Sequence, residues 1–383
     1  MSFGLIILTI IWFLLILSFL VLIHEFGHFL AAKAVGVFVE EFGLGYPPRV
    51  KKLFRWRGTL FSLNALPFGG FVRLHGDEAE TLEGKSGSTS QPSVPEDTEF
   101  ASKSIPKRLF IILAGVFVNF VFGSLAFALI YSRIGIPTPT GIIEIIEVQP
   151  DSPAATAGLQ VYDTITGVQA GEASLQPTRS NDFISFVTQH KGEEVSVSIR
   201  RNDTEGTPVE ETLPVYVRTD EEKTEGDGSM GIGLSDTDLR FYPGWQMPFR
   251  GIWVGLQEAV SMGWLIVTTL RDMAVDLFTR GVVPKDVAGP VGIIDQAFEV
   301  QAVKQGFLAN LNTAALLSIN LAIMNLLPIP ALDGGRALFI VVEPLIGKER
   351  RRRWEGKANA IGFTLLIGLI VLITLNDILR IVF

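Results

Sequence analysis

The sequence predicts a polytopic α-helical membrane protein that carries one separate β-rich domain. Of the 383 residues, 48% are hydrophobic and 19% are charged, whereas soluble domains are about 25% charged. Four apolar segments are long enough to cross a bilayer, which takes about 20 helical residues. Between the second and third segments, the alternation of apolar and polar residues is typical of β-strands. We therefore expect two pairs of transmembrane helices separated by a domain outside the membrane.

The candidate spans contain few charged residues. With approximate ends, they are Phe3–Ala32, Leu109–Tyr131, Thr313–Ile346 and Ala358–Phe383. Pro328 and Pro330 interrupt the third span, because proline removes a helical hydrogen bond. The stretch Ile252–Leu270 contains Glu258 and several glycines. It predicts an amphipathic helix on the membrane surface rather than a fifth span.

Basic residues orient these spans, because cytosolic loops carry an excess of Lys and Arg. Such residues follow the first span, precede the second and join the third to the fourth: Lys33, Arg49, Lys51, Lys52, Arg55, Arg57, Lys103, Lys107, Arg108, Lys348 and Arg350 to Arg353. Residues 33–108 and 347–357 are therefore expected in the cytosol. Residues 134–312 and both termini are expected outside the plasma (inner) membrane.

The first cytosolic segment predicts a β-hairpin and a linker. Val37–Gly45 and Thr59–Leu74 alternate loosely and contain many glycines, which predicts a hairpin within residues 37–74 that dips toward the membrane. Exposed strand edges are not tolerated in lipid, so the hairpin must pack against protein or line a cavity. Residues 77–100 are rich in Glu, Ser, Gly, Thr and Pro, which predicts a flexible acidic linker.

Residues 141–235 are expected to form the external domain. Strand patterns at Ile142–Val148 and Val195–Ile199 accompany a short helix within Ser152–Leu159 that ends at a glycine. The pattern S-P-A-x-x-A-G-L and the glycine-rich Gly228–Leu234 resemble a circularly permuted PDZ domain of the bacterial protease type. That resemblance implies a groove for a peptide C-terminus or a trimmed end; an unrelated β-rich spacer is the alternative. The rest of the chain divides into two halves of a membrane core and an external amphipathic linker region: residues 1–140, 313–383 and 236–312.

The most informative motif is His24-Glu25-Phe26-Gly27-His28, at the end of the first span. The H-E-x-x-H spacing places two imidazoles one helical turn apart, with a carboxylate beside them. This arrangement binds zinc and supplies a general base. A helix with two satisfied histidines is the alternative. However, ionisable groups at membrane depth are costly and usually functional, and a divalent cation compensates that cost.

A catalytic zinc site usually has three protein ligands and one water. The chain has no cysteine and only four histidines, so the third ligand is a His, Asp or Glu. The best candidate is Asp333, which follows the two prolines of the third span; a turn-forming Asp-Gly is the alternative. Two histidines and a carboxylate also suit iron, but a hydrolytic glutamate beside them favours zinc.

Two motifs together resemble the site-2 protease family of intramembrane zinc metalloproteases. They are H24-E-F-G-H28 and N325-L-L-P-I-P-A-L-D333-G. The order of spans, basic segment and external domain is similar to bacterial members that cleave anti-sigma factors. The resemblance implies one Zn²⁺ ion held by His24, His28 and Asp333, with Glu25 as the catalytic base. A single PDZ-like domain departs from members that carry two in tandem.

The same resemblance suggests residues that contact the substrate. It implies that Asn325 holds the substrate backbone in an extended form, and capping of the broken helix is the alternative. Asn119 belongs to a G-x-x-x-N pattern with Gly115 on the second span and is expected to assist at the site. Gly69 and Gly70 lie in the hairpin strand that is expected to pair with a locally unwound substrate.

The function implied is hydrolysis of a peptide bond in or near the transmembrane segment of a single-span protein whose external part is already trimmed. The active site is expected near the cytosolic face. The partners are this substrate and the lipid bilayer; a net charge of −8 gives no hint of nucleic acid. Two alternatives remain. A membrane transporter would also carry broken helices with polar residues at membrane depth, and a non-catalytic PDZ membrane scaffold would need no Glu25.

Overall fold

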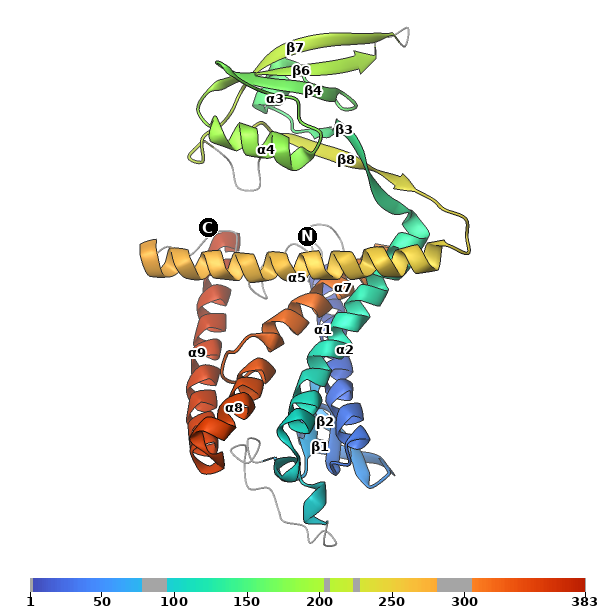
Figure 1. Cartoon of the computed structure of the whole chain (residues 1–383), viewed down its shortest axis with the longest axis vertical. Helices are drawn as coiled ribbons and strands as arrows, with labels where there is room; N and C mark the ends of the chain where they lie inside the picture. The colour runs from blue at the N-terminus through green and yellow to red at the C-terminus, as the bar shows by residue number, and fades with distance from the viewer. Residues whose placement is uncertain (1–2, 78–94, 203–206, 223–227, 281–304, 383) are drawn as a thin grey trace. The chain divides into compact units, whose positions relative to one another are not determined.

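The computed structural model describes residues 3–77, 95–202, 207–222, 228–280 and 305–382. The chain forms two compact units (Figure 1). We call Met1–Ile130 with Pro248–Phe383 the helical unit, and Tyr131–Met247 the β unit.

Six helices and a small sheet make up the described part of the helical unit. The helices are α1 (Phe3–Ala34), α2 (Ile105–Ile134), α5 (Met247–Arg280), α7 (Phe307–Leu326), α8 (Asp333–Ile346) and α9 (Lys348–Val382). Among the described residues, three stretches are long and apolar enough to cross a membrane: Ile7–Ala34, Ile105–Ile134 and Phe307–Leu326. The protein is therefore built on membrane-spanning helices. The predicted fourth span, Ala358–Phe383, falls on α9 and beyond it and stays a prediction.

The third predicted span, Thr313–Ile346, consists of two helices rather than one. Helix α7 ends at Leu326, and α8 begins at Asp333 after a turn that contains both prolines. The two glycines after Asp333 allow this return. A Cβ on Gly334 would lie 2.2 Å from the Leu326 carbonyl oxygen, and one on Gly335 would lie 2.2 Å from the Ile329 carbonyl oxygen. The L-D-G-G sequence thus brings the start of α8 against the end of α7.

The predicted hairpin is present within residues 37–74, and its first strand is longer than the predicted pattern Val37–Gly45. Strand β1 is Val39–Trp56 and strand β2 is Thr59–Leu74. Each strand folds back, so that Glu41–Leu44 lies between Leu60–Leu63 and Gly70–Arg73. The sheet shares a hydrophobic core with α1, α2 and α8, formed by Phe29, Val39, Phe42, Val72, Ile111, Ile340 and their neighbours. The hairpin therefore packs against protein, as the rule on exposed edges requires.

Most of the predicted acidic linker, residues 78–94, lies outside the described residues. Its ends are packed rather than free. The Asp77 carboxylate accepts a hydrogen bond from Arg336 at 2.6 Å. At the other end, Phe100 is buried, and its backbone N–H donates to the His75 carbonyl oxygen at 2.8 Å. The two ends are thus held close to the sheet and to α8.

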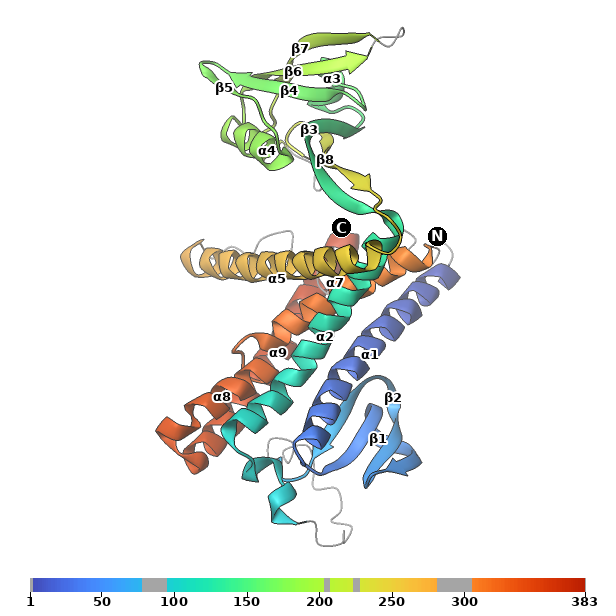
Figure 2. The same ribbon diagram turned by 45° about the vertical axis from the view of Figure 1, so that its right-hand side comes forward.

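Helix α5 covers the predicted amphipathic stretch and crosses α2, as Figure 2 shows. Its buried positions recur every four residues: Gly251, Gly255, Ala259 and Gly263. A Cβ on Gly255 would lie 2.5 Å from the Ser124 carbonyl oxygen of α2. Small residues therefore allow the close approach of the two helices. The side chains of Phe249, Trp253 and Trp264 are exposed.

The basic ends of the helices lie at one end of the helical unit. In both views, the end of α1, the start of α2 and the junction of α8 with α9 lie at the same end (Figures 1 and 2). Those are the positions at which the sequence places its basic segments. These segments therefore lie on one common side of the helical unit, and its assignment to the cytosol stays a prediction.

The β unit is a six-stranded sheet with two short helices. In chain order its elements are β3 (Ile136–Val148), α3 (Pro153–Ala157), β4 (Thr164–Ala170), β5 (Ala173–Leu175), α4 (Ser180–Gln189), β6 (Glu194–Asn202), β7 (Pro208–Tyr216) and β8 (Ile232–Arg240). The strand order is β7-β6-β4-β3-β8, with β5 paired to β4. Ser152 caps α3 and Gly158 ends it in a left-handed conformation. Pairing of Ile136 with Arg240 extends this unit beyond residues 141–235.

Candidate metal centre

The H-E-x-x-H motif lies in the last third of α1, which stays helical through Ala34. Asp333 is the first residue of α8. Three atoms of these elements converge: His24 Nε2 lies 2.8 Å from Asp333 Oδ2, and His28 Nε2 lies 3.2 Å from the same oxygen. The two Nε2 atoms are 3.1 Å apart. The structure therefore brings together the three predicted ligands, although His28 and Asp333 lie 305 positions apart in the chain.

Helix α2 forms the wall behind the histidines. The His28 Nδ1–H donates to the Ile111 carbonyl oxygen at 2.8 Å. Because a carbonyl only accepts, this bond fixes the proton on Nδ1 and leaves a lone pair on Nε2. A Cβ on Gly115 would lie 2.5 Å from His28 Nε2, and one on Gly27 would lie 2.6 Å from the Ala114 carbonyl oxygen. Glycine at these two positions allows α1 and α2 to meet at the ligand atoms.

This arrangement fits a zinc ion. Two imidazole nitrogens and one carboxylate oxygen are a usual catalytic zinc set. Bonds of about 2.0–2.1 Å in a tetrahedron place ligand atoms about 3.3 Å apart, and here the separations are 2.8, 3.1 and 3.2 Å. The His24 and Asp333 side chains are 7% and 15% exposed. Three lone-pair atoms this close and this buried repel one another unless a proton or a metal cation lies among them.

Glu25 lies beside this triad. Its carboxylate interacts electrostatically with His24, His28 and Asp333 and accepts a hydrogen bond from the backbone of Val72. Val72 belongs to β2 and is paired with Phe42 of β1. The candidate base is therefore adjacent to one strand of the hairpin sheet.

The four predicted substrate-binding residues differ in their positions. Asn119 is fully buried, and its side chain lies 3.4 Å from His24 Nδ1. Asn325 is partly buried in the last turn of α7. The Gly69 N–H donates to Ser18 Oγ at 3.3 Å. A Cβ on Gly70 would lie 2.8 Å from a methyl group of Leu22 on α1. The two glycines thus pack β2 against α1.

A buried ionic network near the site was missed by the sequence analysis. Arg336, one turn after Asp333, binds Asp77. Arg108 of α2 donates two hydrogen bonds of 2.7 Å to the carboxylate of Glu343 on α8. Both side chains of this pair are nearly fully buried, at 3% and 6% exposure. Charged residues inside apolar segments are the signal that could have identified this network.

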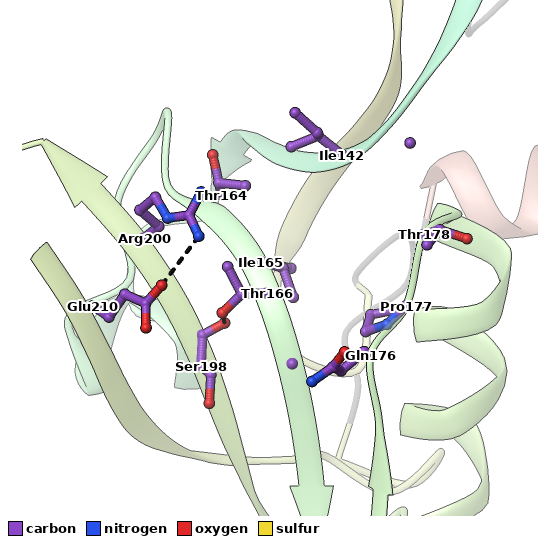
Figure 3. Close-up of a pocket in the computed structure, with 12 residues that line it drawn as sticks. Ile142, Thr164, Ile165, Thr166, Gln176, Pro177, Thr178, Ser198, Arg200 and Glu210 are labelled. Carbon is purple, nitrogen blue, oxygen red and sulfur yellow. Dashed lines mark hydrogen bonds and ion pairs between the residues drawn. The ribbon is translucent and has the colours of Figure 1, made fainter. Parts of the chain in front are cut away.

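The β unit contains two hollows with a different chemical character. One, of about 600 Å³, is lined mainly by polar residues of β4, β6 and the loop after β5, and Arg200 pairs with Glu210 at its rim at 3.1 Å (Figure 3). The other, of about 250 Å³, is an apolar groove between α4 and residues 228–234. Neither lining contains a histidine or a pair of carboxylates. The cluster of His24, His28 and Asp333 on α1 and α8 differs from both hollows, because it could hold a metal ion.

Comparison with known proteins gives one consistent family. The model of peptidase family M50 matches residues 12–369. A zinc metalloprotease RasP of Oceanobacillus iheyensis is 30% identical, covering 97% of this chain and 99% of the relative. A putative zinc metalloprotease of Clostridium perfringens is 32% identical over 97% and 98% of the two chains. The regulator of sigma-W protease RasP of Bacillus subtilis is 28% identical over 97% and 98%.

These matches span both halves of the helical unit and the β unit between them. They favour a protease over the transporter and scaffold alternatives, and they agree with the His-His-Asp group found on α1 and α8. The chain belongs to peptidase family M50, the site-2 protease family of intramembrane zinc metalloproteases.

Proposed function

We propose that His24, His28 and Asp333 hold one zinc ion and that Glu25 is the general base of this protease. The substrate is a single-span membrane protein that is cut in or near its transmembrane segment after its external part has been trimmed. The observation that carries this proposal is the convergence of the three ligand atoms within 3.2 Å at the end of an apolar helix.

The chemistry assigns a role to each side chain. When bound, zinc polarises the scissile carbonyl and lowers the pKa of water to about 7. Glu25 takes the proton of the attacking water and passes it to the leaving amine. Ile111 holds the ring of His28 through its carbonyl oxygen. Gly27 and Gly115 keep the two helices close enough for both histidines to face Asp333.

The hairpin sheet presents the substrate to this site. A helical peptide bond is closed to attack, so the substrate must unwind and become extended. Residues 70–74 of β2 lie at the edge of the sheet, since they pair with β1 along one side, and the Val72 backbone donates a hydrogen bond to Glu25. An extended substrate added to this edge would lie beside the base. Asn325, at the end of α7, is proposed to hold the other side of the extended segment.

The site is proposed to lie near the cytosolic face. The basic segments around residues 33–108 and 347–357 are proposed to be cytosolic, with both termini outside and α9 as the fourth span. The exposed Trp253 and Trp264 of α5 suit a helix that lies at the membrane surface.

The β unit is proposed to be a PDZ-like filter outside the membrane. Its apolar groove lies between α4 and the glycine-containing segment that leads into β8. Strand β8 ends the strand order of the sheet, so a peptide end can add to it as a further strand. The groove is proposed to bind the new end of a trimmed substrate. The Bacillus subtilis relative, named a regulator of sigma-W protease, suggests an anti-sigma factor as the substrate class.

The test uses two single-span reporters, one trimmed outside the membrane and one carrying a folded external domain. Purified wild type is expected to cut only the trimmed reporter, within or next to its span as mapped by mass spectrometry. A zinc chelator and the Glu25→Gln substitution should each abolish cutting. Cutting in a soluble loop, or equal cutting by Glu25→Gln, would refute the proposal.

A further inference from the structure

Helix α2 presents three groups to the metal-site histidines at intervals of four residues: the Ile111 carbonyl, Gly115 and Asn119. The first group accepts a hydrogen bond from His28 Nδ1. The second leaves room for both rings. The third, Asn119, is 0% exposed, and its side-chain nitrogen lies 3.4 Å from His24 Nδ1.

The Asn119 side chain carries an unpaired atom. Among the described residues, its Oδ1 is buried and has no hydrogen-bond partner. A buried amide oxygen without a partner is unfavourable, because it has lost its hydrogen bonds to water. The backbone of the same residue is firmly held, because Ser318 Oγ on α7 donates to the Asn119 carbonyl oxygen at 2.9 Å. This bond holds the backbone of Asn119 against α7, and a rotation of the amide exchanges its oxygen and nitrogen without moving that backbone.

The tautomer of His24 decides that orientation. Its Nε2 faces Asp333 and His28 and must carry a lone pair to bind a metal ion. The proton of the neutral ring is then on Nδ1, which becomes a donor. Two donors cannot bond each other, so the NH₂ group of Asn119 cannot be the partner. A half-turn of the amide about its last side-chain bond brings Asn119 Oδ1 to His24 Nδ1. The Nδ1–H then donates a hydrogen bond to this oxygen.

We propose that Asn119 is a positioning residue that accepts a hydrogen bond from His24 Nδ1–H through its side-chain oxygen. It thereby fixes the tautomer and the ring plane in which Nε2 faces the metal. The Ile111 carbonyl does the same for His28, so α2 orients both histidines. This inference rests on the proposed function of the triad and replaces the substrate contact expected for Asn119.

Zinc affinity tests the proposal without any activity assay. Full-length protein is purified and its zinc affinity is measured by competition with a chromogenic chelator. Asn119→Leu keeps the side-chain size but removes the acceptor, and a loss of about 10- to 100-fold in affinity is expected. Asn119→Asp keeps the acceptor oxygens and should stay within a few fold of wild type. Ser124→Ala is the matched control, because it removes another buried polar group of α2, one bonded only to the Phe120 carbonyl.

Two results would overturn the proposal: wild-type zinc affinity in Asn119→Leu, or an equal loss in Asn119→Asp and Asn119→Leu. If Asn119→Leu does not fold, ¹⁵N NMR of the histidines in zinc-loaded wild type decides. The proposal predicts a protonated Nδ1 on His24, and a bare Nδ1 contradicts it. Zinc bound and cleavage retained in Glu25→Gln would instead refute the proposed function, so the two failures are distinguishable.

Discussion

At the scale of single residues, the candidate metal site joins groups from distant parts of the chain: His24 and His28 on α1 and Asp333 on α8. The i, i+4 spacing places His24 and His28 on one helix face whatever the fold. Asp333 was predicted as the third ligand because a carboxylate in an apolar stretch needs a partner. The contacts behind the ligands could not be predicted. The Ile111 carbonyl has no side-chain signature. Asn119 was predicted to contact substrate, and nothing in the sequence pointed to its contact with His24.

Gly115 gives a prediction at this scale. A methyl group there would lie 2.5 Å from His28 Nε2 and 2.8 Å from His24 Nε2. The histidine rings must move, and such overpacking costs about 1–3 kcal/mol. Gly115→Ala should therefore weaken zinc binding, as measured by chelator competition. Gly368→Ala on α9, where nothing lies within 4 Å of the new Cβ, should have no effect. Equal zinc affinity in the two variants would contradict the assigned role of Gly115.

At the scale of elements, the sequence located the helices but not their terminations or their partners. Two prolines predicted the break in the third span. The glycines after Asp333 allow the start of α8 to pack against the end of α7. The first strand of the hairpin was predicted to end at Gly45, but β1 continues to Trp56. That continuation is exposed along its length and carries basic residues. Because neither of its faces is buried, its sequence lacks the alternation of apolar and polar residues that would predict a strand. The small residues on one face of α5 are explained only by the close approach of α2, which the sequence does not predict.

The buried Arg108–Glu343 pair gives the second prediction, because it joins α2 to the helix that carries Asp333. Loss of one partner leaves an uncompensated buried charge, which costs about 3–5 kcal/mol. Glu343→Gln should therefore lower the thermal midpoint of the detergent-solubilised protein by many degrees. Glu349→Gln changes the exposed pair with Arg353, and exposed pairs contribute about 0–1 kcal/mol. Similar midpoints for both variants would show that the network does not hold the two helices together.

At the scale of the whole molecule, the apolar segments and the positions of the basic residues along the chain predicted a membrane core interrupted by a β-rich domain. The division into a helical unit and a β unit has that form, although the β unit extends from Tyr131 to Met247. Strand pairing between residues 136–139 and 237–240 lies outside the motif that suggested the domain. The motif predicted the middle of the domain, whereas the ends of the domain depend on the pairing of strands that are distant in the chain.

The filter role of the β unit gives the third prediction. Ile184 and Ile142 are matched exposed residues, at 51% and 53%, that line the apolar groove and the polar hollow respectively. Ile184→Arg should block the groove and change how strongly trimmed substrate ends are preferred, measured as the ratio of cleavage rates for the two reporters. Ile142→Arg should leave that ratio unchanged. The filter assignment fails if Ile184→Arg behaves as wild type.

Topology gives the fourth prediction, and the absence of cysteine makes it simple to test. Single cysteines at exposed positions are labelled with a membrane-impermeant maleimide in intact cells. Glu172→Cys in the β unit should react at once. Ser104→Cys, just before α2, should react only after the membrane is permeabilised. The reverse pattern would invert the proposed orientation and place the metal site near the outer face.

The most direct test of the central claim is zinc content and cleavage measured on the same preparations of wild type, Glu25→Gln and Asp333→Ala. Wild type should hold one zinc ion and cut the trimmed reporter. Glu25→Gln should keep the zinc and lose cleavage, and Asp333→Ala should lose both. Cleavage by Glu25→Gln, or full zinc content together with cleavage in Asp333→Ala, would contradict the assignment of the site.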